Sequence, residues 1–119
     1  MNDAQALSGS DSEIRALAQP VFDEVMAAHE AADYARLLPH LSAEMQEAMT
    51  EETFEEIVGE HLASLGDLSA TDYLGSLHKA DATQVLWKAR YSESDAEVLW
   101  QLFLAQVDGK VQVVGLLFS

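Results

Sequence analysis

The residues of this sequence best suited to chemistry are two histidines, one aspartate and several large aromatic residues. Asp72, beside Tyr73, is the one carboxylate that we consider as a general base, a function that needs apolar surroundings to raise its pKa. A pocket between helix and sheet would be lined by His29, Tyr34, His61, Asp72, Trp87, Tyr91 and Trp100. The simpler interpretation, which we favour, is that the aromatic residues fill an ordinary core and that Asp72 is solvated. We therefore assign no catalytic residue.

The four histidines do not form a metal-binding pattern, although many carboxylates surround them. His29, His40, His61 and His78 occur at spacings that match neither H-x₃-H nor H-E-x-x-H. Cysteine is absent, which excludes disulfides, thiol catalysis and metal centres held by cysteine. The sequence also contains no G-x-G-x-x-G, P-loop or G-x-S-x-G motif. We therefore predict no metal and no cofactor.

The net charge of −15, from 21 acidic and 6 basic residues, is distributed unevenly. Residues 1–67 carry 15 acidic and 2 basic side chains, whereas residues 68–119 carry 6 and 4. Nucleic-acid partners are excluded, because binding to phosphates needs clustered Lys and Arg. The acidity fits either a surface adapted to high salt or a docking site for a basic protein partner, and the sequence does not choose between them.

The length of 119 residues, 49% of them hydrophobic, suits one compact domain. No apolar run approaches the roughly 20 residues of a membrane span, and the first residues lack the basic and apolar regions of a signal peptide. We expect a soluble, cytoplasmic protein without a membrane partner. Residues 1–10 are expected to be flexible, and residues 11–119 to form a single domain.

Apolar residues recur at three- and four-residue spacing through the first half of the chain, which predicts helices. The longest stripe runs from Ile14 to His29 and stays in phase on both sides of Pro20. We therefore expect one kinked helix, capped by Asp11 or Ser12. Further helices are expected to begin after the capping residues Asp33, Ser42 and Thr50, and the last of these helices is expected to end at Gly66.

After Gly66 the hydrophobic period changes from 3.6 to 2, which predicts strands. The four expected strands cover residues 69–78, 83–91, 97–107 and 110–118. Their short connections make neighbouring strands antiparallel, and the Asp108-Gly109 dipeptide favours a two-residue type I′ turn. The prediction is an α+β fold in which N-terminal helices pack on a four-stranded antiparallel meander.

The last hairpin has two apolar faces. With a two-residue turn, Val107 lies opposite Lys110, and facing positions sum to 217. The outward face then has only two polar residues among eight, whereas in a sheet with one solvated face, apolar inward residues alternate with polar outward residues. The helices, another protein or a second copy of the chain must cover it, and we favour a two-fold contact between copies. The candidate interface residues are Leu99, Gln101, Phe103, Gln112, Val114, Leu116 and Phe118.

The order of elements and two segments resemble the nuclear-transport-factor-2-like superfamily, which has a cystatin-like α+β cone. HEAADYARLLPHLSAEM at 29–45 looks like the acidic loop and short helix of that family, and VDGKVQVVGLLFS at 107–119 looks like its closing hairpin. The resemblance covers roughly residues 12–119 and points to small bacterial members of unknown function. It implies a curved sheet, a concave side that often holds a pocket, and a sheet that often mediates dimers.

Ketosteroid isomerases and SnoaL-like cyclases of this superfamily place a carboxylate base in the cone. Their catalytic motif is not matched here residue by residue, so no site residue is carried over. We therefore expect a non-catalytic binding or accessory module, homodimeric through the sheet, with a small apolar ligand in the cone as one option. The alternatives are an isomerase or cyclase with a carboxylate or histidine base, and an acidic protein–protein adaptor. A filled cone would favour the module, and an open pocket with a buried carboxylate would favour the enzyme.

Overall fold

The N-terminal half of the structure is helical, and its longest element is helix α1 (Asp11–Glu30). The computed structural model of the chain describes residues 4–119. Helix α1 begins at a capping box, in which the Ser10 side chain accepts from the Glu13 N–H while the Glu13 carboxylate accepts from the Ser10 N–H. Ser10 caps the helix in place of Asp11 or Ser12, the two caps that we expected, because only Ser10 lies three residues before a glutamate. The helix runs through Pro20 as predicted.

Several short helical elements follow α1. They are α2 (Tyr34–Leu37), η1 (Leu38–His40), α3 (Ala43–Ala48), α4 (Glu51–Glu56), η2 (Ile57–Leu62) and η3 (Ala63–Leu65). The expected caps Asp33, Ser42 and Thr50 are confirmed, since each side chain accepts from a backbone N–H of the first turn. The stretch that we predicted as one α-helix widens to a π-helix over η2 and narrows to a 3₁₀-helix over η3.

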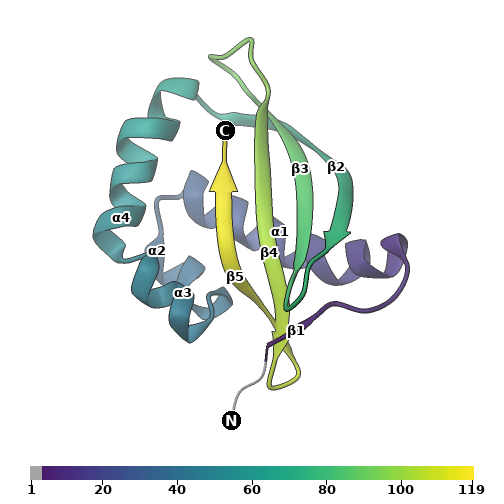
Figure 1. The fold of residues 1–119 in the computed structure, drawn as a ribbon. Helices are drawn as coiled ribbons and strands as arrows, with labels where there is room; N and C mark the ends of the chain where they lie inside the picture. Colours follow the sequence, from purple (N-terminus) through teal and green to yellow (C-terminus); the bar gives the residue numbers. More distant parts are fainter. Residues whose placement is uncertain (1–3) are drawn as a thin grey trace.

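The second half forms a curved antiparallel sheet (Figure 1). Its strands are β1 (Gln5–Ala6), β2 (Leu68–His78), β3 (Thr83–Tyr91), β4 (Val98–Val107) and β5 (Lys110–Phe118). The four predicted strands are confirmed to within one residue at each end. β1 was not predicted and lies in the segment that we expected to be flexible. The pairing of β3 with β4 ends at Leu104. Gln5 lies opposite Gln106, just beyond that point, so β1 extends the sheet along the same edge of β4 that β3 occupies.

The β4–β5 hairpin contains a bulge that corrects the expected register. Pairs sum to 217 from the turn to Leu104 opposite Val113, but Phe103 then lies opposite Gly115, and Val114 is the extra residue. The constant register was therefore wrong beyond Val113. Every later side chain of β5 turns to the other face, as a one-residue slip requires.

The bulge changes the placement of three candidate interface residues. Val114 is the unpaired residue of the bulge and lines a hollow with Ser42 and Ala43 at the start of α3. Leu116 is buried in the core, and the Phe118 ring stacks on Trp100 with ring centroids 4.9 Å apart, so both face the helices instead of the outside. Leu117, expected to face inward, is 54% exposed on the opposite face. Gly115 permits this arrangement, because a Cβ there would lie 3.0 Å from Cδ1 of Phe103.

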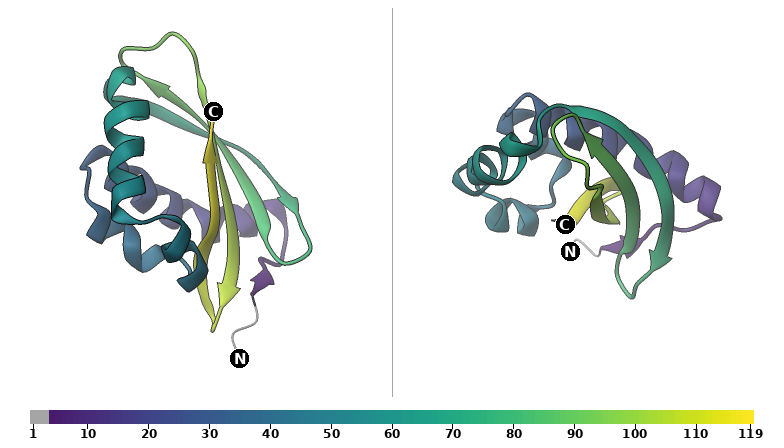
Figure 2. Two further views of the ribbon diagram at one scale, coloured as in Figure 1. Left: turned by 60° about the vertical axis from the view of Figure 1, so that its left-hand side comes forward. Right: turned by 90° about the horizontal axis from the view of Figure 1, so that it is seen from above.

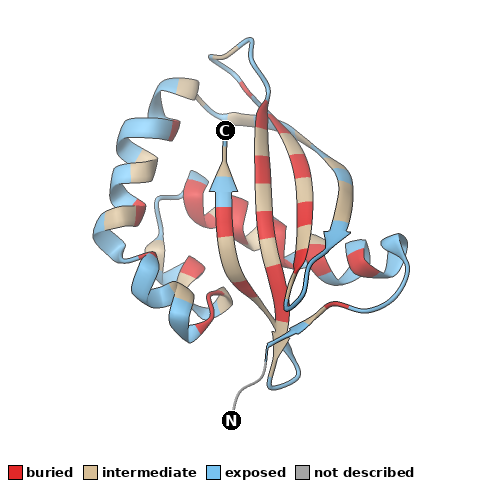
Figure 3. Ribbon diagram, in the orientation of Figure 1, coloured by how far each residue is buried: buried red, intermediate tan, exposed pale blue. Residues whose placement is uncertain are grey.

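Helix α1 lies across one face of the sheet, and the shorter helices lie on the β5 side (Figures 1 and 2). Buried residues alternate along β3 and β4 (Figure 3). Phe22 of α1 stacks on Trp87 of β3, with ring centroids 4.0 Å apart and planes within 2°. Figure 1 views the opposite face, which no helix of residues 4–119 covers. We call this surface the outer sheet face.

Candidate functional site

Four of the seven candidate pocket residues are aromatic, and the structure packs them into the core. Trp87 and Trp100 are fully buried, and Tyr91 is nearly so. Nε1 of Trp87 donates to Oε1 of Gln19 (3.1 Å), and Nε1 of Trp100 donates to the hydroxyl of Tyr91 (3.2 Å). The hydroxyl of Tyr34 donates to the carbonyl at the end of α3 (2.7 Å). These side chains therefore build the core, in agreement with the interpretation favoured from the sequence.

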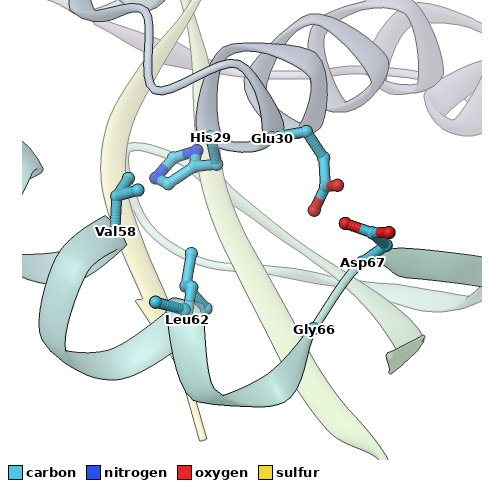
Figure 4. Close-up of a pocket in the computed structure, with 7 residues that line it drawn as sticks. His29, Glu30, Val58, Leu62, Gly66 and Asp67 are labelled. Carbon is cyan, nitrogen blue, oxygen red and sulfur yellow. The ribbon is translucent and has the colours of Figure 1, made fainter. Parts of the chain in front are cut away.

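A pocket of about 220 Å³ opens between the C-terminal end of α1 and the helical segment η2–η3 (Figure 4). It is lined by His29, Glu30, Val58, Leu62, Ala63, Gly66 and Asp67. Binding sites for drug-sized molecules have roughly 300–1,000 Å³, so this pocket suits a ligand with few heavy atoms. We predicted His29 as a pocket residue and did not predict the other six.

Backbone irregularities shape the pocket wall. Val58 and Leu62 belong to the π-helix η2, a rare geometry that occurs frequently at functional sites. Gly66 ends η3 with a φ of 85°, and a Cβ there would collide with the side chains of Ser92 and Glu93. Glycine is therefore required where the chain turns from the pocket wall into β2.

His29 is the residue of the pocket with the clearest chemical potential. Its side chain is 5% exposed and lies against the rings of Phe54 and Trp100, at centroid distances of 5.0 and 5.3 Å. Nδ1 lies 2.7 Å from the carbonyl oxygen of Val25. Because a carbonyl only accepts, Nδ1 carries the proton and donates it.

The second ring nitrogen of His29 has no protein partner. Burial lowers the pKa of His29, while the hydrogen bond to Val25 opposes that shift, so the ring is neutral at pH 7. With the proton on Nδ1, Nε2 offers a lone pair, yet no donor among the described residues reaches it. An unpaired buried polar group costs about 1–3 kcal/mol. Such an atom beside a pocket is therefore a candidate contact for a ligand.

Two carboxylates form the other side of the pocket. Figure 4 shows the side chains of Glu30 and Asp67 pointing toward one another, with the tip of the His29 ring directed toward Val58. Oε2 of Glu30 accepts from the N–H of Leu68 at 3.3 Å. Within residues 4–119, neither carboxylate forms an ion pair with a basic side chain. The C-terminal end of α1, where Glu30 lies, adds the negative end of a helix dipole.

The two remaining candidate pocket residues, Asp72 and His61, lie elsewhere. Asp72 is exposed on β2, opposite Lys88. His61 is exposed on η2, where one of its ring nitrogens and carboxylate oxygens of Glu56 and Glu60 lie within 4.8 Å of one another. The wider π-helical turn brings residues five apart onto one side. Exposed groups of this kind are common without an ion, so this trio carries no assignment.

The outer sheet face is the second candidate surface. Leu74, Leu77 and Leu117 are 54%, 49% and 54% exposed there, and the amide side chains of Gln84 and Gln101 are hydrogen-bonded to each other. The charged groups on its β2–β3 side are Asp72, Lys88, Arg90 and the neighbouring Glu97, whose carboxylate lies 3.3 Å from the Lys88 ammonium and 3.9 Å from the Arg90 guanidinium. These four charges cancel. This part of the surface therefore combines exposed leucines with charges that sum to zero.

Comparison of the chain with protein-family models, with curated proteins and with solved structures finds no match in any of the three. Among the described residues, no helix has the length and apolar character needed to cross a membrane. The assignment of function therefore depends on the pocket and on the outer sheet face alone.

Proposed function

We propose that this protein is a cytoplasmic, non-catalytic module of the nuclear-transport-factor-2-like type that binds a small ligand in the pocket at the end of α1. The observation that carries the proposal is Nε2 of His29, a buried acceptor without a protein partner at the pocket. Apolar groups of Val58, Leu62 and Ala63 would contact the rest of the ligand. Helix α1 lying across a curved sheet supports the proposed cone (Figure 2).

The pocket favours binding over catalysis. An isomerase or cyclase needs a base together with a hydrogen-bond donor for the oxyanion that develops. His29 could act as the base, but its ring is the only side chain among the seven lining residues that carries a donor, and that donor is engaged by Val25. The carboxylates of Glu30 and Asp67 are exposed, and Asp72 lies on the outer sheet face, so no buried carboxylate supports the enzyme alternative in the described chain.

The ligand-binding proposal is tested by native mass spectrometry and by NMR of the imidazole groups. We expect a reproducible extra mass on the purified protein, or changes in the His29 signals during a screen of small amines, alcohols and amides. His29→Phe, which has no imidazole signal at this position, should lose the extra mass, whereas the control His78→Phe, at the exposed end of β2, should retain both responses. A clean protein mass with His29 signals that no compound changes would refute the proposal, and would indicate a buried water at Nε2.

We also propose that two copies of the chain associate through the outer sheet face. Contiguous apolar surface on a soluble protein usually marks an interaction site. A chain of net charge −15 repels its own copy over most of its surface, but the four charges on the β2–β3 side of this face cancel. Leu99, Gln101, Phe103 and Gln112 remain candidate interface residues, and the exposed residues Leu74, Leu77 and Leu117 join them.

Sedimentation of paired variants tests the dimer. Leu74→Lys and Leu117→Lys place a charge on the outer sheet face at exposed positions that do not contribute to the core, and we expect monomers. Leu17→Lys is the matched control, because Leu17 is an exposed leucine on α1, and this variant should stay dimeric. A monomeric wild-type chain would refute the dimer. Salt-sensitive capture of a basic protein by the helical half would then favour the adaptor alternative.

A further inference from the structure

We infer that the π-helix η2 is a lid over the pocket and that protonation of His29 opens it. The lid comprises Ile57–Leu62, and the tip of the His29 ring is directed toward Val58 of the lid (Figure 4). Nε2 of His29 is buried, so a ligand reaches this atom only when the lid moves. As regulation of ligand binding, the inference rests on the proposed function, whereas the opening itself is measured without a ligand.

A proton added to His29 can bind only at Nε2. Nδ1 already carries a proton, which it donates to the carbonyl of Val25 at 2.7 Å. The closed imidazolium would be a buried cation whose second N–H has no acceptor, because its surroundings are the side chain of Val58 and the rings of Phe54 and Trp100. A buried charge without a partner is strongly unfavourable. Protonation therefore destabilises the closed arrangement.

The titratable groups around His29 do not compensate this charge in the closed arrangement. They are Glu30 at the end of α1, the four glutamates of α4, Glu60 and His61 of η2, Asp67 before β2 and Tyr91 of β3. All are exposed except Tyr91, whose hydroxyl accepts from Trp100. Within residues 4–119, none forms a hydrogen bond with the His29 ring. Opening exposes the imidazolium to water at the negative end of the α1 dipole, which favours the protonated form.

The lid is weakly held to the rest of the chain. Of its six residues only Leu62 is buried. Gly59 lies where no atom is within 4 Å of the position of a Cβ, and glycine lowers the stability of a helical turn. The carbonyl of Leu65 accepts from the N–H of Glu93 at 2.8 Å, so the end of η3 stays attached and the motion is confined to η2. A segment of this kind opens at a lower free-energy cost than global unfolding.

The size of the effect follows from the linkage between protonation and opening. In the open arrangement His29 is solvated, with a pKa near 6.5, whereas burial lowers its pKa in the closed arrangement. The closed lid is therefore most stable above this pH and becomes less stable as the pH falls. From about pH 7.5 to about pH 5.5, the open population should rise up to about tenfold. Acid also removes the lone pair of Nε2, so a bound ligand would be released.

The test is native-state hydrogen exchange of the full, ligand-free chain, followed by NMR. The readout is the N–H of Ala63, which donates to the carbonyl of Val58 and closes the last turn of the lid. We expect its protection, corrected for intrinsic exchange, to fall up to about tenfold over this pH range. Its protection should stay below that of amides in β3 and β4. Low concentrations of urea should not change it, because a local opening exposes little surface.

Two histidine variants identify the group that titrates. His29→Phe should abolish the pH dependence of Ala63 exchange, because no proton can then bind beside the lid. His61→Gln is the matched control, since His61 is the exposed histidine of the same π-helix, and this variant should keep the full response.

The outcomes separate the lid from ligand binding. An Ala63 amide with the same protection and urea dependence as the amides of β4 would show global unfolding and overturn the inference, and this comparison needs no variant. A response lost in His61→Gln but kept in His29→Phe would also overturn it. A pH-dependent, urea-independent Ala63 response in a chain that binds no ligand would support the lid and remove only the proposed function.

Discussion

The substitution Gly115→Ala tests the bulge that decides which residues of β5 face outward. A Cβ at this position would lie 3.0 Å from Cδ1 and 3.1 Å from Cβ of Phe103. Overpacking of this kind costs about 1–3 kcal/mol. Alanine gains roughly 0.5–1 kcal/mol over glycine in a strand, because it restricts the unfolded chain. We therefore expect the free energy of unfolding to fall by about 0.5–2 kcal/mol.

A double-mutant cycle in urea, followed by tryptophan fluorescence at one protein concentration, measures this contact. In the Phe103→Val background the ring is gone, so Gly115→Ala should become neutral or stabilising, with an interaction energy of about 1 kcal/mol. Gly59→Ala is the control, because no atom lies within 4 Å of a Cβ at that position. Additive effects of Gly115→Ala and Phe103→Val would show that the two residues do not face each other, and would refute the bulged register.

Three further predictions concern single contacts. The free energy of unfolding should fall as the pH drops below about 6.5, because His29 becomes protonated in the unfolded chain while burial lowers its pKa in the folded state. His29→Phe should flatten this part of the plot of unfolding free energy, from urea denaturation, against pH. An unchanged slope in the variant would contradict the lowered pKa of His29. Tyr73→Phe should raise the pKa of Asp11, which the Tyr73 hydroxyl holds low through a 2.7 Å hydrogen bond, and carboxyl ¹³C titration would show it. Thr83→Val removes the oxygen that accepts from the Leu7 N–H at 2.9 Å, so unfolding should become easier by about 1–3 kcal/mol and the Leu7 amide should exchange faster.

The regular elements could be predicted because their signals are local. Period-2 alternation, the Asp108-Gly109 turn and the capping residues Asp33, Ser42 and Thr50 each act over a few positions, and all are found in the structure. The signals that decide β1 and the bulge are not local. β1 has two residues and no alternation, and it exists because β4 offers free backbone groups beyond the end of β3. Gly115 within a strand was a visible hint of the bulge that the turn-based register did not use.

The candidate site could be predicted only in part for the same reason. His29 was recognisable as a polar residue in an apolar stripe. Its pocket forms where the end of α1 meets a π-helix, and the spacing of apolar residues does not indicate a change from α to π geometry. Asp67 directly follows a helix-terminating glycine and reads from the sequence as a solvated loop residue. Tertiary packing alone places it beside Glu30 (Figure 4).

Because Gln5 pairs with Gln106, β1 cannot join the sheet until the ribosome has synthesised β4. Synthesis proceeds at about 5–20 residues per second, so β4 emerges roughly 5–20 s after β1. Throughout that interval the apolar stripe of α1 has no sheet to cover it, and nascent chains in such a state are prone to aggregate. The segment already made is also the part of the chain with 15 acidic and 2 basic residues. Electrostatic repulsion between unfinished chains therefore opposes aggregation of the helical half until the strands of the sheet have been synthesised.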